Sequence, residues 1–216
     1  MGRVIVIEFV TLDGVITDPD GSARTPYGGW AFRHGPETVA GDKFRLGDIL
    51  DSATMLLGRR TWELFASLWP TRSDEFSQKM NAMPKRVATR TLTDLSAWAN
   101  STPIDGDLLD AVRAEREQRD VIVTGSISVL RTLQHADVVD QYRLLTFPPV
   151  VCSGERLFIT QIDPPLARTY TNQAGAAVLS YYDRGHRSSE PQTAMASAPR
   201  SKTGQRTVGI GPAASS

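Results

Sequence analysis

At residues 53–63 the chain reads Ala53-Thr54-Met55-Leu56-Leu57-Gly58-Arg59-Arg60-Thr61-Trp62-Glu63. Its first five residues form a short apolar run, which is typical of a strand covered on both faces. Gly58 lets another group come close, because it has no side chain. The two arginines and Thr61 stand where a helix begins, and the free N–H groups and dipole of a helix N-terminus suit a phosphate. An exposed arginine pair with ordinary capping is the alternative interpretation.

A second stretch, residues 120–130, repeats the same order of features. The β-branched run from Val121 to Thr124 ends in Gly125-Ser126, and a helical pattern follows. Two such junctions in one sheet can face one crevice at the carboxyl ends of the strands, where dinucleotides bind. Neither junction has the glycine spacing of a Rossmann fingerprint or the Gly-Lys-Ser/Thr of a Walker loop. The residues alone therefore predict an α/β domain with two phosphate-binding junctions.

Four segments carry a family resemblance. Residues 58–63 are similar to the Gly-Arg-x-Thr-Trp/Phe-Glu motif of dihydrofolate reductases, and residues 123–127 stand where that family has a Gly-Gly pair. Residues 11–16 resemble the Ser-Leu-Asp-Gly opening of the reductase domain of bacterial riboflavin-biosynthesis enzymes, the RibD C-terminal type. Residues 149–158 resemble the Pro-Val-x-Gly-x-Gly-x-x-Leu-Phe segment of that group, with Cys152 in place of the first glycine. The ordered set spans about residues 3 to 183.

The resemblance implies a dihydrofolate reductase-like fold, a three-layer α/β domain whose central mixed β-sheet is flanked by helices. It also implies an NADPH-dependent reductase of a small heterocyclic substrate, most similar to the 5-amino-6-(5-phosphoribosylamino)uracil reductase of riboflavin biosynthesis. A homodimer is implied by the resemblance only. A dihydrofolate or pterin reductase is one alternative, and a dinucleotide-binding protein without turnover is another.

The implied NADPH site takes its residues from three strand ends. Arg59, with Arg60, pairs with the ribose phosphate, which favours NADPH over NADH. Glycine at the first junction allows close approach, the threonine after the arginines bonds the pyrophosphate, and the second junction lends backbone N–H groups. Two further residues stand where the family holds the adenosine phosphate, although a solvated strand end is the alternative there. The predicted cofactor-binding residues are Gly58, Arg59, Arg60, Thr61, Thr89, Arg90, Gly125, Ser126 and Ile127.

Reduction of a C=N bond also needs a proton, and Asp13 is the predicted catalytic donor because it leaves the first strand beside the expected pocket. A turn aspartate bonded to its own backbone is the alternative for Asp13, and an ordered water is another proton source. Trp30 and Phe32 close a loop rich in glycine and proline, where they either wall a flat ring or anchor the loop on the core. Trp30 and Glu37 are the predicted substrate-binding residues, and Glu37 is a second candidate for the proton.

Two departures from the family patterns leave the substrate open. The Pro-Trp pair and helix carboxylate that grip folate in dihydrofolate reductases are not clearly matched. The Asp-Asn-Pro-x-Leu segment that follows the threonine in riboflavin enzymes is replaced here by Trp62-Glu63-Leu64. No deaminase domain or zinc motif of those enzymes is present in the sequence. The pattern therefore indicates a stand-alone relative of the riboflavin-type reductases.

Composition limits the other function classes. The chain has 24 Lys plus Arg against 24 Asp plus Glu, so no global field argues for nucleic acid or an anionic membrane. The single cysteine, Cys152, excludes an internal disulfide and favours the cytoplasm. The three histidines are far apart in sequence and show no zinc-ligand spacing, so no metal site is expected. No apolar stretch approaches the length of a membrane span.

The composition changes near residue 185. Residues 1–184 are the predicted reductase domain, whereas residues 185–216 are dominated by Ser, Ala, Pro, Gly and Thr, which predicts a disordered tail. The tail has four basic residues against one acidic residue. A protein that contacts nucleic acid through this tail is a third hypothesis, and an inert tail is the preferred interpretation.

Overall fold

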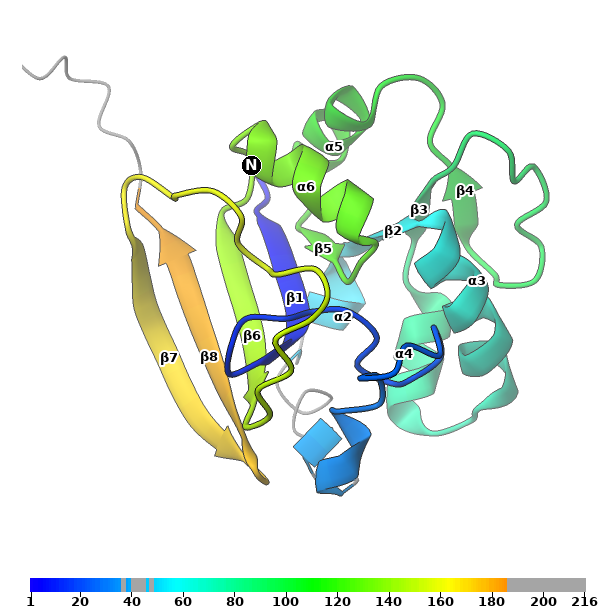
Figure 1. Cartoon of the computed structure of the whole chain (residues 1–216). Helices are drawn as coiled ribbons and strands as arrows, with labels where there is room; N and C mark the ends of the chain where they lie inside the picture. Colours follow the sequence, from blue (N-terminus) through cyan, green and yellow to red (C-terminus); the bar gives the residue numbers. More distant parts are fainter. Residues whose placement is uncertain (36–37, 40–45, 47–48, 186–216) are drawn as a thin grey trace, which may run out of the picture. The chain divides into compact units, whose positions relative to one another are not determined.

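An eight-stranded sheet with helices on both faces forms the described part of the chain in the computed structural model (Figure 1). The structure describes residues 1–35, 38–39, 46 and 49–185, which lie in a single compact unit, Met1–His186. The strands are β1 (Val4–Thr11), β2 (Thr54–Gly58), β3 (Lys85–Ala88), β4 (Ser101–Pro103), β5 (Val121–Val123), β6 (Gln141–Phe147), β7 (Leu166–Ala174) and β8 (Ala177–Arg184). Their spatial order is β4-β3-β2-β5-β1-β6-β8-β7.

The sheet is mixed. Each of the neighbouring pairs in the part β4-β3-β2-β5-β1-β6 is parallel. Beyond β6, β8 and β7 add an antiparallel hairpin. Every residue of β2 is buried, as expected for a parallel strand covered on both faces. β1, predicted as a central strand from the Val- and Ile-rich start of the chain, lies between β5 and β6. The predicted α/β class with a central mixed sheet is confirmed.

Three clusters of buried apolar side chains pack among the described residues, and the two largest lie on opposite faces of the sheet. Successive residues of β2 belong to different cores, because side chains alternate across a strand: Leu57 packs with Trp62 and Met80, whereas Leu56 packs with Val112 and Leu130. The first face therefore carries α2 (Ile49–Ser52), α3 (Arg59–Leu68), α4 (Glu75–Ala82) and the short turn η2 (Trp69–Thr71). The second face carries α5 (Leu108–Arg116) and α6 (Ile127–His135). Another short turn, η1 (Phe32–His34), follows the first loop.

The structure differs from the sequence expectations at two places. β4 was not expected, because Ser101–Pro103 has no apolar pattern; it pairs only with β3 at the sheet edge, where a proline is tolerated. The alternating sequence pattern predicts a terminal hairpin with a three-residue turn, Gln173-Ala174-Gly175. In the structure the turn is Gly175-Ala176, so the ladder extends to the pair Ala174 and Ala177. The apolar spacing of Phe44, Leu46, Ile49 and Leu50 predicts a helix over residues 37–52. Most of that segment lies outside the described residues, which include α2 at its end. The predicted disordered tail lies outside them too, apart from Gly185, and stays a prediction.

No helix in the described ranges combines the length and the apolar composition that a membrane crossing requires.

Candidate functional site

The two predicted junctions meet at the carboxyl edge of the sheet. β2 passes directly into α3, and the neighbouring parallel strand β5 passes through residues 124–126 into α6. The amide of Gly58 donates to the carbonyl of Gly125 over 3.3 Å, so the two turns are in contact. The Gly125–Ser126 peptide is cis. Both helix N-termini therefore open on the same crevice.

Both glycines are required by this close approach. A Cβ at Gly58 would lie 2.0 Å from Ser126 Oγ and 2.7 Å from Ser126 Cβ. A Cβ at Gly125 would lie 2.9 Å from Thr61 Oγ1, and the φ of Gly125 is +104°, a value that disfavours other residues. The side chains of Ser126 and Thr61 thus fill the space that a larger residue at either glycine would need.

The chain leaves the two junctions in opposite directions. α3 packs on one face of the sheet on its way to β3, and α6 packs on the other face on its way to β6. Adjacent strands whose connections diverge in this way create the crevice in which open α/β sheets bind ligands. Neither helix has an acidic residue in its first turn, so the positive end of each dipole is left uncompensated by its own side chains. The crevice is therefore suited to an anion with two phosphates.

A cationic end of the crevice lies toward β3. Gly58 and Ala88 are paired in the β2–β3 register, so the residues after β3 emerge beside Arg59. Arg59 donates from Nη1 to Thr91 Oγ1 over 2.8 Å and from Nε to Glu63 over 2.7 Å. Arg60 and Arg90, two further predicted phosphate ligands, are exposed in the same two segments. Their contacts with a phosphate stay a prediction.

Thr89, another predicted phosphate ligand, organises the turn after β3. Its hydroxyl accepts from the amide of Leu92 over 3.0 Å and from the amide of Thr91 over 3.3 Å. A hydroxyl that accepts two bonds still has its own hydrogen to donate to a ligand. Thr89 therefore shapes the turn that presents Thr91 to Arg59, and its predicted contact with the phosphate remains open.

Asp13 lies in a different setting from the one predicted for a proton donor. Its carboxylate accepts from Thr11 Oγ1 over 2.6 Å, from the Cys152 amide over 2.8 Å and from the Val151 amide over 3.1 Å. The Thr11 hydroxyl, followed by these amides, lowers the pKa of Asp13 to about 2. An ionised carboxylate with three donors cannot readily supply a proton at neutral pH. The geometry favours a structural role, in which Asp13 clamps the loop after β6 to the loop after β1.

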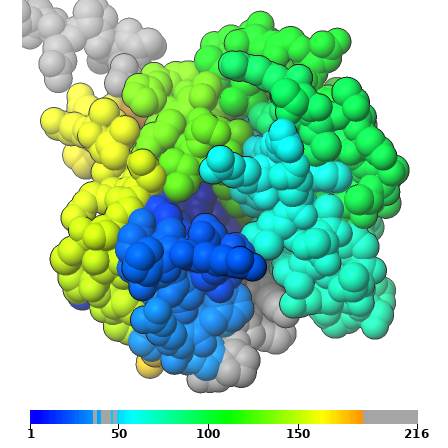
Figure 2. Space-filling model, turned by 45° about the vertical axis from the view of Figure 1, so that its right-hand side comes forward, coloured from blue at the N-terminus to red at the C-terminus, as the bar shows by residue number. Residues whose placement is uncertain are grey.

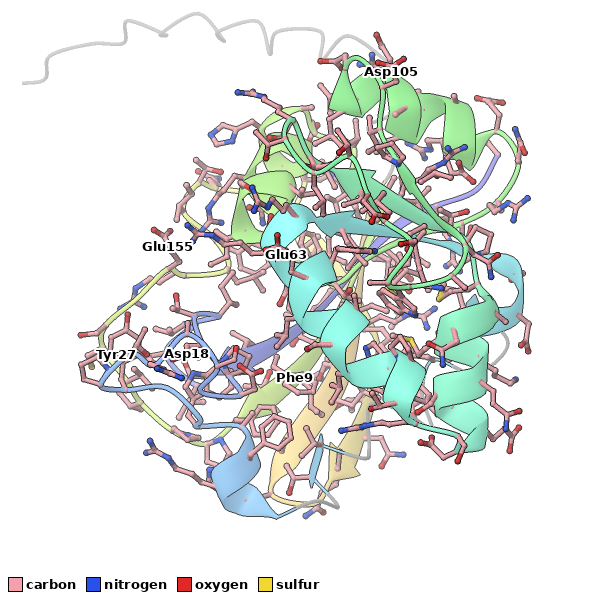
Figure 3. The ribbon with its side chains drawn as sticks, turned by 90° about the vertical axis from the view of Figure 1, so that its right-hand side faces the viewer. Phe9, Asp18, Tyr27, Glu63, Asp105 and Glu155 are labelled. Carbon is pink, nitrogen blue, oxygen red and sulfur yellow. The ribbon has the colours of Figure 1, made fainter. Side chains whose placement is uncertain are left out.

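The clamp is part of a wider contact between these two loops. Glu155 donates its amide to Thr17 Oγ1 over 2.8 Å, and a Cβ at Gly154 would lie 3.2 Å from the ring of Tyr27. Arg131 of α6 donates to the Leu157 carbonyl over 2.7 Å, which ties the second loop to the helix as well. Figure 3 shows Tyr27 and Glu155 on neighbouring loops at the left of the view, and Glu63 of α3 nearer its middle. The loop after β6 is therefore held from two sides, by the loop after β1 and by α6.

A recess lies between these parts on the surface of the molecule. Figure 2 shows it between the loop after β1 (blue), α6 (yellow-green) and α3 (cyan), with atoms of β1 (dark blue) at its base. Phe9 of β1 is only partly buried and packs against Phe147 with ring centroids 5.3 Å apart. The recess therefore borders α3 and α6, the two helices that follow the predicted phosphate-binding junctions.

The predicted substrate-binding role of Trp30 does not agree with its position. Trp30 is 1% exposed, packs edge-on against Phe147 and donates from Nε1 to the Thr17 carbonyl over 2.9 Å. Its ring therefore anchors the loop on the core, which was the alternative interpretation, because burial leaves no ring surface for a ligand. Glu37, the other predicted substrate contact, lies outside the described residues.

Sequence reasoning missed several polar groups at this edge. Thr91 and Glu63 contact Arg59. Nothing in the sequence indicates this contact, because Thr91 is a single threonine after a strand and Glu63 is one residue of a longer motif. Glu8 is a partly buried carboxylate on β1, on the face that holds Val6. A single acidic residue within an apolar central strand is a sequence signal that could have identified Glu8 as a candidate site residue. Thr124 Oγ1 is buried and has no hydrogen-bond partner among the described residues. A buried hydroxyl without a partner is costly, so its place beside the crevice is consistent with a missing ligand.

Replacing Asp13 by asparagine tests the two interpretations of this residue. We expect a loss of about 1–2 kcal/mol in unfolding free energy at pH 7, because an amide nitrogen cannot accept the bonds that one carboxylate oxygen accepts. The lowered pKa stabilises the native protein above about pH 4, and this contribution disappears as the pH falls toward 2. Urea unfolding at pH 7 and pH 3 should therefore show a smaller difference between wild type and Asp13→Asn at pH 3. An unchanged stability at pH 7 would contradict the clamp.

Comparison with known proteins agrees with this architecture. The family model described as "RibD C-terminal domain" matches residues 3–171. The uncharacterized protein YyaP of Bacillus subtilis (strain 168) is 25% identical over 194 residues, which cover 85% of this chain and 96% of that protein. A crystal structure of a protein provisionally assigned to riboflavin biosynthesis, from Shewanella sp. PV-4, superposes with a TM-score of 0.56 and 18% identity, covering 86% of this chain and all of that chain.

A second solved structure, a pyrimidine reductase-like protein from Corynebacterium diphtheriae, superposes with a TM-score of 0.52 and 13% identity, covering 84% of this chain and 91% of that chain. At these identities the two structures establish the fold, and the predicted dihydrofolate reductase-like three-layer arrangement is confirmed. The family model covers well over half of the chain, in the segment that holds both junctions and the clamp. On this basis the chain belongs to the RibD C-terminal domain family.

Proposed function

We propose that this protein is an NADPH-dependent reductase of a small heterocyclic substrate. The observation that carries the proposal is the contact between the two junctions, where Gly58 and Gly125 bring the N-termini of α3 and α6 together. The residues fit a dinucleotide by two independent features. The helix N-termini at the two junctions offer free backbone N–H groups to a pyrophosphate, and the Thr124 hydroxyl, which has no hydrogen-bond partner among the described residues, lies beside them. Family membership supports the same cofactor class.

We infer the direction in which the dinucleotide would lie along the sheet edge from the order of the strands. The adenosine end lies toward β3, where Arg59 and its neighbours supply positive charge for the ribose phosphate. The pyrophosphate lies at the amides of the first turns of α3 and α6. The nicotinamide then extends toward β1 and the recess, because β5 and β1 are the next strands in that direction. This direction brings the reactive end to the base of the recess, beneath the loop after β1.

When bound, the nicotinamide supplies a hydride to the substrate. The protein binds both molecules, orients them and excludes water with the loop after β1, which Asp13 and the Thr17 hydroxyl hold against the loop after β6. The substrate nitrogen also needs a proton. The carboxylate of Asp13 is ionised at neutral pH, so we assign proton delivery to an ordered water in the recess rather than to Asp13.

A pyrimidine ribosylamine is the proposed substrate, as in the 5-amino-6-(5-phosphoribosylamino)uracil reductase reaction. Family membership and the names of the two structural relatives support this class. A dihydrofolate or pterin substrate is the alternative within the same chemistry. The homodimer and the cytoplasmic location stay predictions of the resemblance and of the cysteine content.

The first experiment is a titration of the protein with NADPH and, separately, NADH, followed by nicotinamide fluorescence. We expect NADPH to bind about tenfold tighter or more than NADH, because a charge-assisted bond to the ribose phosphate contributes about 1.5–3 kcal/mol. Arg59→Ala should remove most of this difference and leave NADH binding unchanged. Loss of reduced-nicotinamide absorbance with pyrimidine ribosylamines, pterins and folates then identifies the substrate class.

Arg113→Ala is the matched control, because Arg113 is an exposed helix arginine in an ion pair with Asp110 on α5. It should bind both dinucleotides as wild type does. Equal or absent binding of NADPH and NADH to the wild type would overturn the proposed cofactor. Tight NADPH binding with no turnover of any tested heterocycle would favour the dinucleotide-binding protein without reductase activity.

A further inference from the structure

Arg59 is held on two sides before any ligand arrives. Its Nε donates to Glu63 Oε1 over 2.7 Å, one helical turn along α3, and its Nη1 donates to Thr91 Oγ1 over 2.8 Å, in the turn after β3. A guanidinium has five N–H groups. Within the described residues, the hydrogens of Nη2 and the second hydrogen of Nη1 remain for a ligand. The part of Arg59 that stays available is therefore the outer end of the group, beside the N-terminus of α3.

Both anchors are themselves fixed. Glu63 lies within α3. The residue before it, Trp62, is buried in the core, and this burial restricts the motion of the backbone at Glu63. Thr91 is placed by the turn in which the Thr89 hydroxyl accepts two amides. Figure 3 shows Glu63 near the start of α3, at the end that opens on the crevice. Two rigid elements, a helix and a strand-end turn, thus determine where the arginine points.

From this geometry we infer that Glu63 and Thr91 are positioning residues that set the preference for NADPH over NADH. The inference rests on the proposed function and deepens it. An unrestrained arginine loses side-chain freedom when it binds a phosphate, whereas Arg59 is already held by two hydrogen bonds, so less affinity is lost on binding. The ribose of NADH carries a hydroxyl in place of this phosphate, so the preorganised arginine benefits NADPH alone.

The negative charge of Glu63 acts in the opposite direction, because it repels a phosphate. This repulsion is weak here, since the side chains of Arg59 and Glu63 are 50% and 41% exposed and water and salt screen the charges. Orientation therefore outweighs repulsion. The two effects separate in variants: Glu63→Gln keeps a carbonyl oxygen that accepts from Nε and removes the charge, whereas Glu63→Ala removes both.

The test measures NADPH and NADH dissociation constants for wild type, Glu63→Ala, Glu63→Gln and Thr91→Val by nicotinamide fluorescence. We expect Glu63→Ala and Thr91→Val each to weaken NADPH about three- to tenfold, the range for freeing one long side chain. NADH binding should stay unchanged in both variants. Glu63→Gln should bind NADPH within about twofold of wild type, because the acceptor is retained. Asp110→Ala is the matched control, since it removes the acidic member of a comparable helix ion pair on α5.

The outcomes distinguish failure of this inference from failure of the proposed function. If NADPH binds tighter than NADH and Arg59→Ala abolishes the difference, but Glu63→Ala and Thr91→Val match wild type, the positioning role is wrong and the cofactor stands. Tighter NADPH binding by Glu63→Ala would also overturn it, because repulsion would then dominate. If wild type binds both dinucleotides equally or not at all, the proposed function and this inference fall together.

Discussion

Replacement of Gly58 by alanine is expected to lower the unfolding free energy by about 2–3 kcal/mol, the upper part of the range for overpacking. The added Cβ would lie 2.0 Å from Ser126 Oγ and 2.7 Å from Ser126 Cβ, so rotation of the serine hydroxyl alone cannot relieve the clash. The junctions must then separate. For a domain of this size the melting temperature should fall by roughly 5–10 °C. Thermal unfolding followed by circular dichroism measures the change.

The same substitution should weaken NADPH binding by about tenfold or more, because the amides of the two junctions no longer converge on one pyrophosphate. Ser126→Gly in the Gly58→Ala background removes both clashing atoms and should recover most of the stability and binding, which would reveal a strong coupling between the two positions. Gly185→Ala is the control, because its Cβ would make an ordinary 3.5 Å contact with Pro164. Failure of Ser126→Gly to rescue Gly58→Ala would mean that the contact between the junctions is not the cause.

Replacement of Lys85 by methionine should lower the unfolding free energy by about 3 kcal/mol at pH 7. Lys85 is 0% exposed, and its Nζ donates to the carbonyls of Asn81, Met83 and Ala99 over 2.8–3.0 Å. It also lies 4.4 Å from the centroid of the Trp98 ring. Methionine fills a similar volume but leaves these carbonyls without their donor, and each lost hydrogen bond costs about 1–3 kcal/mol. Part of this cost is offset, because the variant no longer buries a charged group. Urea denaturation measures the difference.

The difference in unfolding free energy between wild type and Lys85→Met should increase as the pH rises above 8. Burial lowers the pKa of Lys85 from 10.5 to about 8, so the cost of the buried charge is fully present below pH 8 and is relieved as the pH rises toward 10.5. Wild type should therefore gain stability relative to Lys85→Met between pH 8 and pH 10.5. Lys79→Met, which removes a half-exposed ion pair with Asp51, should cost about 0.5 kcal/mol or less at either pH. An equal loss in both variants would contradict a special role for the buried lysine.

The sequence did not reveal Lys85 as a core residue. It precedes Arg86 in a short strand, and two adjacent cations suggest a solvated strand rather than a buried amine. The three carbonyls come from the end of α4, from the segment after it and from the segment before β4, so their convergence depends on how a helix, a strand and a loop pack. A linear pattern contains no information about such a convergence of backbone oxygens.

The sequence by itself determined the α/β class, most strands and helices, and the two strand–glycine–helix junctions, because apolar periodicity and glycine placement are local properties of the chain. It also indicated that Arg59 belongs to an anion site, since both the residue and its helix N-terminus are adjacent in sequence. The resemblance added the family and the order of the segments. The fold class and the junctions are confirmed because they depend on neighbours within a few residues, whereas the anion site at Arg59 stays a prediction.

Only the tertiary structure decided how side chains far apart in sequence share the site. Asp13 accepts hydrogen bonds from the amides of Val151 and Cys152, so the residue predicted as a proton donor holds two loops together. Trp30, predicted to contact the substrate, is buried against Phe147. Thr91 reaches Arg59 only because β3 pairs beside β2. Burial and hydrogen bonding set the protonation and exposure of a side chain, and both depend on which strands become neighbours, which the sequence of one segment does not specify.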